Sequence, residues 1–277
     1  MRPTFLVIGA QKAATTSLYH YLGAHPDVFV SPGKELNYFV LEQRWSNGQR
    51  WYEAQFEEAG DARARGEASP SYTMFPAFTG VPARIAELIP DVRLVYLVRH
   101  PIERMRSSYL HGLSRGGEHR PIDVALVHDL RYQTATMYGM QVQQYLRHFS
   151  REQLLVIRSE DLRDRRADTL RLVFTHLGVD PDLTSHDPHV EHHRSEHKQV
   201  PRAGARAMLQ IGWYSRALEA APEVVQRAHG RLTRRSLRAT DTELSAAVER
   251  GIIERLRPDL ELLCEQLQMD TDPWCLL

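Results

Sequence analysis

Residues 5–17, with the sequence FLVIGAQKAATTS, constrain the fold of this chain more than any other segment. An apolar strand leads into a short loop that carries Lys12, and the hydroxyl residues Thr15, Thr16 and Ser17 then open a helix. The first N–H groups of a helix lack partners within it and, together with the helix dipole, attract an anion. The segment therefore predicts a phosphate-binding loop, although an ordinary strand, turn and helix with a surface lysine has the same local pattern.

Lys12 stands out because lysine is rare in this chain. Among 35 lysines and arginines, lysine occurs only at positions 12, 34 and 198, which favours a function for the lysine in the loop. The 35 aspartates and glutamates balance the basic residues, so no overall field attracts nucleic acid or an anionic membrane. Anion binding therefore has to come from local groups such as the Lys12 loop.

Strand-like and helix-like segments alternate along the chain. Short apolar runs, typical of parallel strands buried on both faces, occur at residues 5–10, 27–30, 66–69, 92–98 and 154–157. Helical spacing or helix start and stop signals occur at residues 16–24, 81–89, 101–113, 134–149, 161–177 and 242–268. A chain of 277 residues can bury one substantial core, so we expect one α/β domain over residues 1–277, with a central parallel sheet flanked by helices.

Two polar, turn-rich segments predict surface loops, at residues 112–121 and 184–204. The second contains a histidine cluster at residues 186–197, in which Asp187 and Glu191 are interleaved. This composition leaves metal binding open as an alternative, but the cluster lacks one clear ligand spacing, and we expect a solvated loop.

The sequence predicts a soluble, cytoplasmic protein. No apolar stretch approaches the length of a bilayer span, and the run at residues 5–10 is too short for the core of a signal peptide. The two cysteines, Cys264 and Cys275, are expected to be reduced thiols, as is usual in a chain without an export signal.

The Lys12 loop departs from the Walker A pattern. A Walker loop places its lysine directly before Ser or Thr and after two glycines, whereas Lys12 precedes Thr15 by three residues and Gly9 is the only glycine. The loop resembles instead the 5′-phosphosulfate-binding loop of sulfotransferases that use 3′-phosphoadenosine 5′-phosphosulfate (PAPS). Within that superfamily it looks closest to the heparan-sulfate type and its bacterial relatives. The resemblance implies a P-loop-like three-layer sandwich.

Further segments resemble the same family, in the same order and over about two-thirds of the chain. They are HPDV at residues 25–28, KELNYF at 34–39, GEASPSY at 66–72, LVRHPIERMRSSY at 97–109 and VPR at 200–202. Each motif is weak alone, but the ordered set is specific.

The resemblance implies a donor site for PAPS that needs no metal. The loop residues that it implies for the 5′-phosphosulfate are Lys12, Ala13, Ala14, Thr15, Thr16 and Ser17. It implies Arg99 and Ser107 for the 3′-phosphate, and Arg202 in a late loop over the nucleotide. Lys12 is also implied to be catalytic, because a lysine near the bridging oxygen neutralises charge that develops on the leaving phosphate. Alanine disfavours positive φ, so we expect the loop to run through ordinary backbone conformations at positions 13 and 14.

On the acceptor side, the resemblance implies Glu35 as the general base that takes the acceptor's proton. A solvated carboxylate paired with Lys34 is the alternative for Glu35, and His20, His100 or His111 are alternative bases. For Arg104 we expect a salt bridge or a solvated face. Tyr72, Tyr109 and Trp51 are candidates either for an acceptor cleft or for the core.

The predicted function is transfer of a sulfuryl group from PAPS to a hydroxyl or amine of a small-molecule, lipid or glycan acceptor, with release of 3′,5′-ADP. The alternatives are an ATP-dependent P-loop phosphotransferase and a nucleotide-binding protein without catalysis. The missing Gly-Lys-Ser/Thr triplet and magnesium-binding aspartate argue against the first. The arginine-rich chain looks more like a bacterial cytosolic enzyme than a Golgi one, and nothing in the sequence indicates an oligomeric state.

Overall fold

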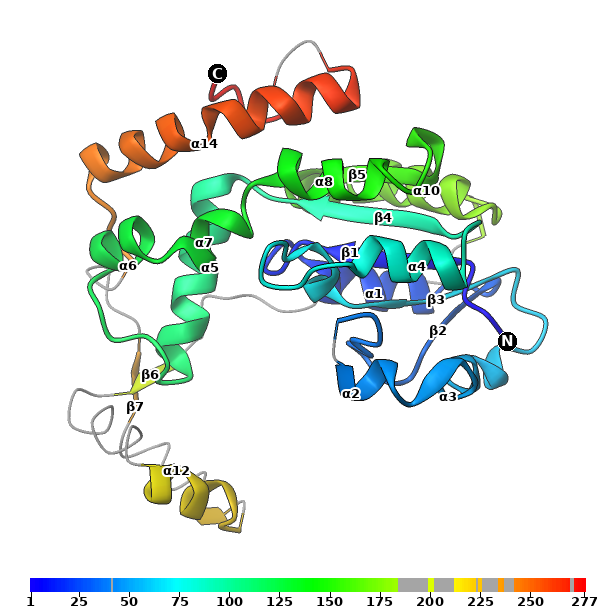
Figure 1. The fold of residues 1–277 in the computed structure, drawn as a ribbon, viewed down its shortest axis with the longest axis horizontal. Helices are drawn as coiled ribbons and strands as arrows, with labels where there is room; N and C mark the ends of the chain where they lie inside the picture. Colours follow the sequence, from blue (N-terminus) through cyan, green and yellow to red (C-terminus); the bar gives the residue numbers. More distant parts are fainter. Residues whose placement is uncertain are drawn as a thin grey trace.

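The computed structural model describes residues 1–40, 42–183, 199–201, 212–222, 224–225, 234–236, 242–269 and 272–277. At its centre lies a five-stranded sheet in the order β2-β3-β1-β4-β5, in which all neighbouring strands run parallel (Figure 1). The strands are β1 (Phe5–Gly9), β2 (Val28–Val30), β3 (Ala64–Ala68), β4 (Arg93–Val98) and β5 (Leu154–Arg158). Each overlaps a predicted apolar run, which confirms the predicted parallel sheet.

Helices cover both faces of this sheet and complete the predicted three-layer sandwich. Helices α1 and α10 lie on one face, and α4 and α8 lie on the other (Figure 1). The helices are α1 (Thr15–Gly23), α2 (Glu42–Trp45), α3 (Gly48–Ala54), α4 (Val81–Leu88), α5 (Pro101–Ser114), α6 (Ile122–His128), α7 (Leu130–Thr134), α8 (Tyr138–Leu146), α9 (Ser159–Asp164), α10 (Arg166–Leu177), α12 (Gly212–Glu219) and α14 (Ala246–Leu267). Short 3-10 helices are η1 (Glu57–Ala59), η2 (Pro70–Thr73) and η3 (Arg151–Gln153), and β6 (Gln199–Pro201) pairs antiparallel with β7 (Arg234–Ser236).

The chain leaves the sheet in opposite directions after β1 and after β4. Helix α1 leads from β1 to β2, beyond β3, whereas the segment after β4 leads to β5 on the other side of the sheet. Ligands of parallel α/β sheets bind at the carboxyl ends of strands where successive connections diverge in this way. Strands β1 and β4 are direct neighbours, so the loops that follow them share one edge of the sheet.

These two loops start from a rigid base. All residues of β1 are buried, and so are all residues of β4 except Arg93 at its start. Full burial of a large aliphatic side chain stabilises a fold by about 1.5–3 kcal/mol, so the central strands fix the positions at which the two loops begin.

Two of the predicted helices are interrupted. The helix predicted at residues 134–149 is replaced by the end of α7 and by α8, and the helix predicted at 161–177 divides into α9 and α10 at Arg165. The start of α8 is fixed from a distance, because the Asp259 carboxylate of α14 accepts the N–H groups of Gly139 at 3.0 Å and Met140 at 2.7 Å. A carboxylate at these positions satisfies N–H groups that a helix leaves unpaired.

The predicted surface loop at residues 112–121 is wrong in part. Helix α5 continues to Ser114, and Glu118 is buried. The Glu118 carboxylate accepts hydrogen bonds from the Arg120 guanidinium at 2.7 and 2.9 Å and from the Tyr132 hydroxyl at 3.0 Å. Burial raises the pKa of Glu118, but these hydrogen bonds outweigh burial and lower the pKa to about 2. The segment is therefore a tethered turn.

The other predicted loop, at residues 184–204, lies outside the described residues except for Gln199–Pro201 in β6. Of the helices within the described ranges, none is both long enough and apolar enough to cross a membrane. Cys264 is a buried and Cys275 an exposed free thiol.

Candidate functional site

The loop between β1 and α1 has the backbone shape of an anion receptor. Lys12 has φ 72° and Ala14 has φ 66° with ψ 22°, so both lie in the left-handed region. This corrects the expectation that an alanine-containing loop keeps to ordinary conformations. Left-handed residues next to right-handed ones turn successive N–H groups toward a common point, and such concave nests bind phosphate. The surrounding fold imposes the shape even though no glycine stands at these positions.

The start of α1 adds to this receptor. Its N-cap residue, Ala14, has no side-chain oxygen to cap the helix, and the first turn contains no acidic residue. An anion from outside is therefore the natural partner for the N-terminus of α1. Thr16 and Ser17 are half-buried, whereas Ala13 and Thr15 are buried. Ala13 can thus contribute its backbone but not its side chain.

Arg99 connects the second loop of this edge to the first. It follows β4, and its guanidinium Nη1 donates a hydrogen bond of 3.3 Å to the carbonyl oxygen of Lys12. The backbone of Arg99 is held by Tyr138, whose hydroxyl donates to the Arg99 carbonyl at 2.7 Å and accepts from its N–H at 3.3 Å. The structure thereby brings together two of the predicted donor-site residues.

Glu103 lies beside the predicted 3′-phosphate residues. Its carboxylate is 3.6 Å from Arg99 Nη2 and 2.8 Å from Arg106 Nη1. Arg106 also pairs with Glu249 of α14 at 3.2 Å, and Ser107 is buried on α5. This network orients the arginines.

Arg104 differs from expectation. It is 1% exposed and donates to the Tyr132 carbonyl at 2.8 Å, so it lies neither in a salt bridge nor on a solvated face. Burial lowers its pKa. The tight packing of α5 against α7 accounts for the burial, because both helices contribute side chains to a second apolar cluster.

Glu35 lies near the start of α1, to which Lys34 connects it. The Lys34 ammonium donates to the Thr16 hydroxyl of α1 at 2.5 Å and lies 3.4 Å from Glu35 Oε1. The Glu35 side chain is 50% exposed, so a substrate can reach it. Glu35 therefore forms the pair with Lys34 that is expected of a surface carboxylate. The same lysine also connects Glu35 to Thr16 in the first turn of α1.

Sequence reasoning missed Glu67, a buried carboxylate of β3 behind the Glu35 turn. It accepts hydrogen bonds from Ser69 at 2.6 Å, Tyr52 at 3.2 Å and Tyr72 at 2.5 Å. Burial raises its pKa, against the opposing effect of these hydrogen bonds. The available signal was an acidic residue within an otherwise uncharged stretch, Gly66 to Ser71, that overlaps the predicted strand at 66–69.

Other candidates fall into the core or outside the described residues. Tyr72 and Tyr109 are buried, whereas Trp51 is half-buried beneath the Arg44 guanidinium, 5.4 Å from its ring centre. Arg202 and the histidine cluster at 186–197 lie outside the described residues. Within the described part of the chain, no three His, Cys, Asp or Glu side chains converge as a metal site would require.

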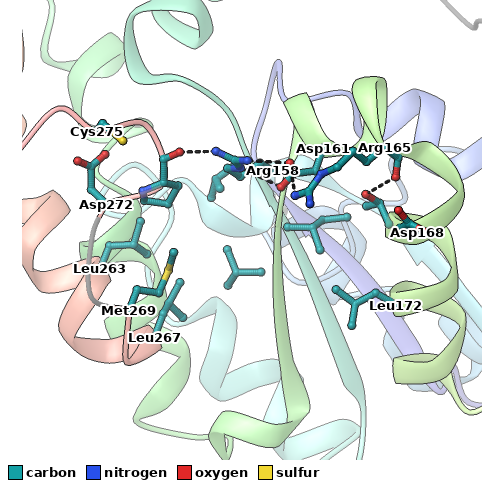
Figure 2. A pocket seen from close by; sticks show the side chains of 15 residues that line it. Arg158, Asp161, Arg165, Asp168, Leu172, Leu263, Leu267, Met269, Asp272 and Cys275 are labelled. Carbon is teal, nitrogen blue, oxygen red and sulfur yellow. Dashed lines mark hydrogen bonds and ion pairs between the residues drawn. The ribbon is translucent and has the colours of Figure 1, made fainter.

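A cavity of about 540 Å³ opens at the carboxyl end of β5 (Figure 2). Figure 2 shows Leu172, Leu263, Leu267 and Met269 around its apolar part. Its arginines, Arg158 and Arg165, pair with Asp161 at 2.7 and 2.8 Å. With this apolar lining and neutralised charge, the cavity does not suit a doubly phosphorylated nucleotide.

Comparisons with known proteins agree with this geometry. The family described as "Sulfotransferase domain" matches residues 2–229. Human heparan sulfate glucosamine 3-O-sulfotransferase 3B1 is 29% identical over 196 residues, which cover 66% of this chain and 47% of the relative. Bovine bifunctional heparan sulfate N-deacetylase/N-sulfotransferase 2 is 26% identical over 206 residues, which cover 65% of this chain and 22% of the relative. The chain thus matches less than half the length of these curated relatives.

Solved structures show the same fold. A sulfotransferase from Alicyclobacillus acidocaldarius superposes with a TM-score of 0.72 and 22% identity, covering 99% of both chains. The sulfotransferase domain from the curacin biosynthetic pathway gives a TM-score of 0.50 at 17% identity, covering 88% of this chain and 99% of that domain. The match over residues 2–229 and the shared fold confirm the resemblance seen in the motifs, and the chain belongs to the sulfotransferase family.

Proposed function

We propose that this chain transfers a sulfuryl group from PAPS to a hydroxyl or amine of a small-molecule, lipid or glycan acceptor and releases 3′,5′-ADP. PAPS-dependent sulfuryl transfer is the reaction of the family. One observation carries the proposal for this chain, namely the hydrogen bond that joins Arg99 to the Lys12 loop at one edge of the sheet. PAPS has anionic groups on both its 5′ and 3′ sides, so it needs two anion-binding groups at a fixed separation.

The donor half of the site would hold PAPS as follows. The N–H groups of the Lys12 loop and the hydroxyls of Thr16 and Ser17 would bind the 5′-phosphosulfate. Arg99, with Ser107 on the following helix, would bind the 3′-phosphate, because a guanidinium donates two parallel hydrogen bonds to a phosphate. Ala13 and Ala14 contribute backbone groups, and Arg202 remains a candidate for the nucleotide from the sequence alone.

In the transfer step, the acceptor oxygen or nitrogen attacks sulfur as the bond from sulfur to the bridging oxygen breaks. The electron pair of that bond stays on the 5′-phosphate, where Lys12 stabilises the added charge. Glu35 takes the proton that the acceptor loses. Its exposed carboxylate and its tether to Thr16 through Lys34 support this assignment.

A screen of phenols, amino sugars, steroid alcohols and oligosaccharides with PAPS tests the proposal. We expect at least one acceptor to gain the mass of one SO₃ group while 3′,5′-ADP forms in equal amount. Lys12→Ala is the matched variant and should slow the transfer by about a hundredfold or more. Binding of 3′,5′-ADP without transfer to any acceptor would favour a nucleotide-binding protein instead. A bacterial, cytoplasmic setting stays a prediction from the sequence.

A further inference from the structure

Glu67 is a hub of hydrogen bonds in the core that the proposed chemistry does not use. Its side chain lies in β3 and is 1% exposed. The carboxylate accepts hydrogen bonds from the hydroxyls of Ser69, Tyr72 and Tyr52, and the nearby backbone N–H of Leu36 lowers its pKa. An ionised carboxylate has only acceptors, so it can satisfy all four donors at once.

This hub reaches three consecutive amides of the turn that follows Glu35. The Leu36 N–H lies close enough to the Glu67 carboxylate to lower its pKa. The Asn37 N–H donates to the Ser69 hydroxyl at 3.0 Å, and the Tyr38 N–H donates to the Tyr72 hydroxyl at 3.1 Å. The hydroxyls of Ser69 and Tyr72 each donate a hydrogen bond to Glu67. Their oxygens are therefore free to accept the N–H groups of the turn.

The turn needs such support because its backbone is strained. Glu35 has φ 60° and Asn37 has φ 52°, both in the left-handed region, which costs roughly 1–2 kcal/mol for a residue other than glycine. Strained residues persist where neighbouring contacts fix them. The Glu35 N–H also donates to the Ala68 carbonyl at 3.2 Å, and Asn37 Nδ2 donates to the Glu35 carbonyl at 3.0 Å.

We propose that Glu67 is a positioning residue for sulfuryl transfer. Its carboxylate fixes the amides of residues 36–38, and the turn then directs the Glu35 side chain outward, to Lys34 and the donor loop. The inference rests on the proposed role of Glu35 as the base. It assigns Glu67 no contact with either substrate.

Glu67→Gln tests this assignment with little change of shape. The amide retains one oxygen but adds two N–H donors, so it cannot satisfy all of the surrounding donors. We expect kcat to fall by about tenfold or more, because misplacement of a catalytic group by 1 Å can cost about a hundredfold. The affinity for 3′,5′-ADP should change by less than about twofold, since the donor loop does not contact Glu67.

Tyr52→Phe is the matched control. It removes another donor to the same carboxylate, but the Tyr52 hydroxyl binds none of the three amides, and phenylalanine keeps the ring that stacks on Tyr38, with 4.3 Å between ring centres. We expect kcat to stay within about threefold of the wild type, because one hydrogen bond to the carboxylate is lost while its contacts toward the three amides remain. An equal fall in kcat for both variants would indicate a general packing role and would overturn the inference.

A double-mutant cycle with Glu35→Gln decides whether Glu67 acts through the base. If it does, Glu67→Gln slows the wild type but leaves the Glu35→Gln protein within about twofold of its own rate. Equal slowing in both backgrounds overturns the inference, as does a Glu35→Gln protein with wild-type activity.

Hydrogen exchange provides a readout that does not depend on activity. The amides of residues 36–38 should exchange about tenfold faster or more in Glu67→Gln, while those of β1 and α1 keep their protection. Unchanged exchange at 36–38 overturns the inference, even if no acceptor is found for the wild type. Absence of transfer alone contradicts only the proposed function.

If Glu67→Gln does not fold, Ser69→Ala replaces it in these tests. This variant removes the hydrogen bond to the Asn37 N–H but not the contacts to Leu36 and Tyr38. It should lower kcat and speed amide exchange in the turn, both to a smaller extent than Glu67→Gln.

Discussion

The Arg99 guanidinium donates a hydrogen bond of 3.3 Å to the carbonyl oxygen of Lys12, and this contact joins the loops that follow two neighbouring parallel strands. Under the proposed function, it would fix the separation between the groups that bind the 3′-phosphate and the 5′-phosphosulfate before the nucleotide arrives. Preorganisation of this kind lowers the ordering cost of binding. We therefore expect the two proposed phosphate sites to respond differently to substitution.

Arg99→Ala should weaken binding of 3′,5′-ADP by about ten- to a hundredfold, the range expected for loss of charge-assisted hydrogen bonds worth about 1.5–3 kcal/mol. AMP, which has no 3′-phosphate, should lose less than about threefold through the same change. Isothermal titration of both nucleotides measures the difference. Arg93→Ala, at the opposite end of β4, is the control and should alter neither affinity. Equal losses for AMP and 3′,5′-ADP would place Arg99 elsewhere than at the 3′-phosphate.

Glu35→Gln should reduce kcat by about a hundredfold or more, as expected when a general base is removed. Binding of 3′,5′-ADP should stay within about threefold of the wild type, because the proposed role of Glu35 is on the acceptor and not on the nucleotide. Steady-state kinetics with a fixed acceptor and a nucleotide titration check the two parts. Glu42→Gln offers a control on the next segment, since Glu42 pairs with Arg84 at 2.8 Å rather than with the donor loop. A Glu35→Gln protein with unchanged kcat would leave His20, His100 and His111 as candidate bases.

Gly9→Ala should destabilise the protein where the donor loop begins. A Cβ atom at this position would lie 1.9 Å from Thr73 Oγ1, so the neighbouring segments must shift. Overpacking of this kind lowers the free energy of unfolding by about 1–3 kcal/mol, which urea unfolding can measure. Adding Thr73→Ala should recover part of the loss, because it removes the clashing oxygen. A Gly9→Ala protein as stable as the wild type would contradict this packing.

Asp259→Asn should change how stability depends on pH. Burial raises the pKa of Asp259 from 3.8 to about 6, against the two backbone N–H bonds that lower it. The folded protein therefore binds this proton more tightly than the unfolded chain. The resulting stability is present below about pH 4 and is lost as the pH rises to about 6, by up to about 3 kcal/mol.

The free energy of unfolding, measured between about pH 4 and pH 7, should accordingly fall less with rising pH in Asp259→Asn than in the wild type. Glu261→Gln, an exposed position of the same helix, controls for a general change in charge. Parallel curves for Asp259→Asn and the wild type would show that Asp259 does not titrate in this range.

Local sequence patterns were enough to predict the sheet. The apolar runs that include Val7, Val95 and Val156 all form strands, because a strand buried on both faces needs little beyond a short stretch of such residues. The helix predicted at 134–149 is confirmed over α8, but its predicted start is wrong, because Asp259, 120 residues beyond Gly139, fixes the start of α8. Contacts over that separation leave no trace in the local pattern.

The candidate site was predictable where a motif brings charge to the end of a strand. Arg99 contacts the Lys12 carbonyl, and Lys34 connects Glu35 to Thr16 at the start of α1, whereas the roles of these residues stay predictions. The left-handed conformation of Ala14 was not predictable, since the fold overrides the preference of alanine. Glu67 was missed because its role depends on amides that reach it from a distant turn. The single domain over residues 1–277 and the role of Arg202 stay predictions.

The central claim is that one nucleotide, with phosphate groups at the 3′ and 5′ positions of its ribose, binds to the Lys12 loop and to Arg99 at the same time. Titration of the wild-type protein with 3′,5′-ADP, AMP and ATP, each with and without magnesium, tests it most directly. We expect 3′,5′-ADP to bind without magnesium and at least about tenfold more tightly than AMP, since the Arg99 contacts add about 1.5–3 kcal/mol. Preference for ATP with magnesium, or equal affinity for AMP and 3′,5′-ADP, would contradict it.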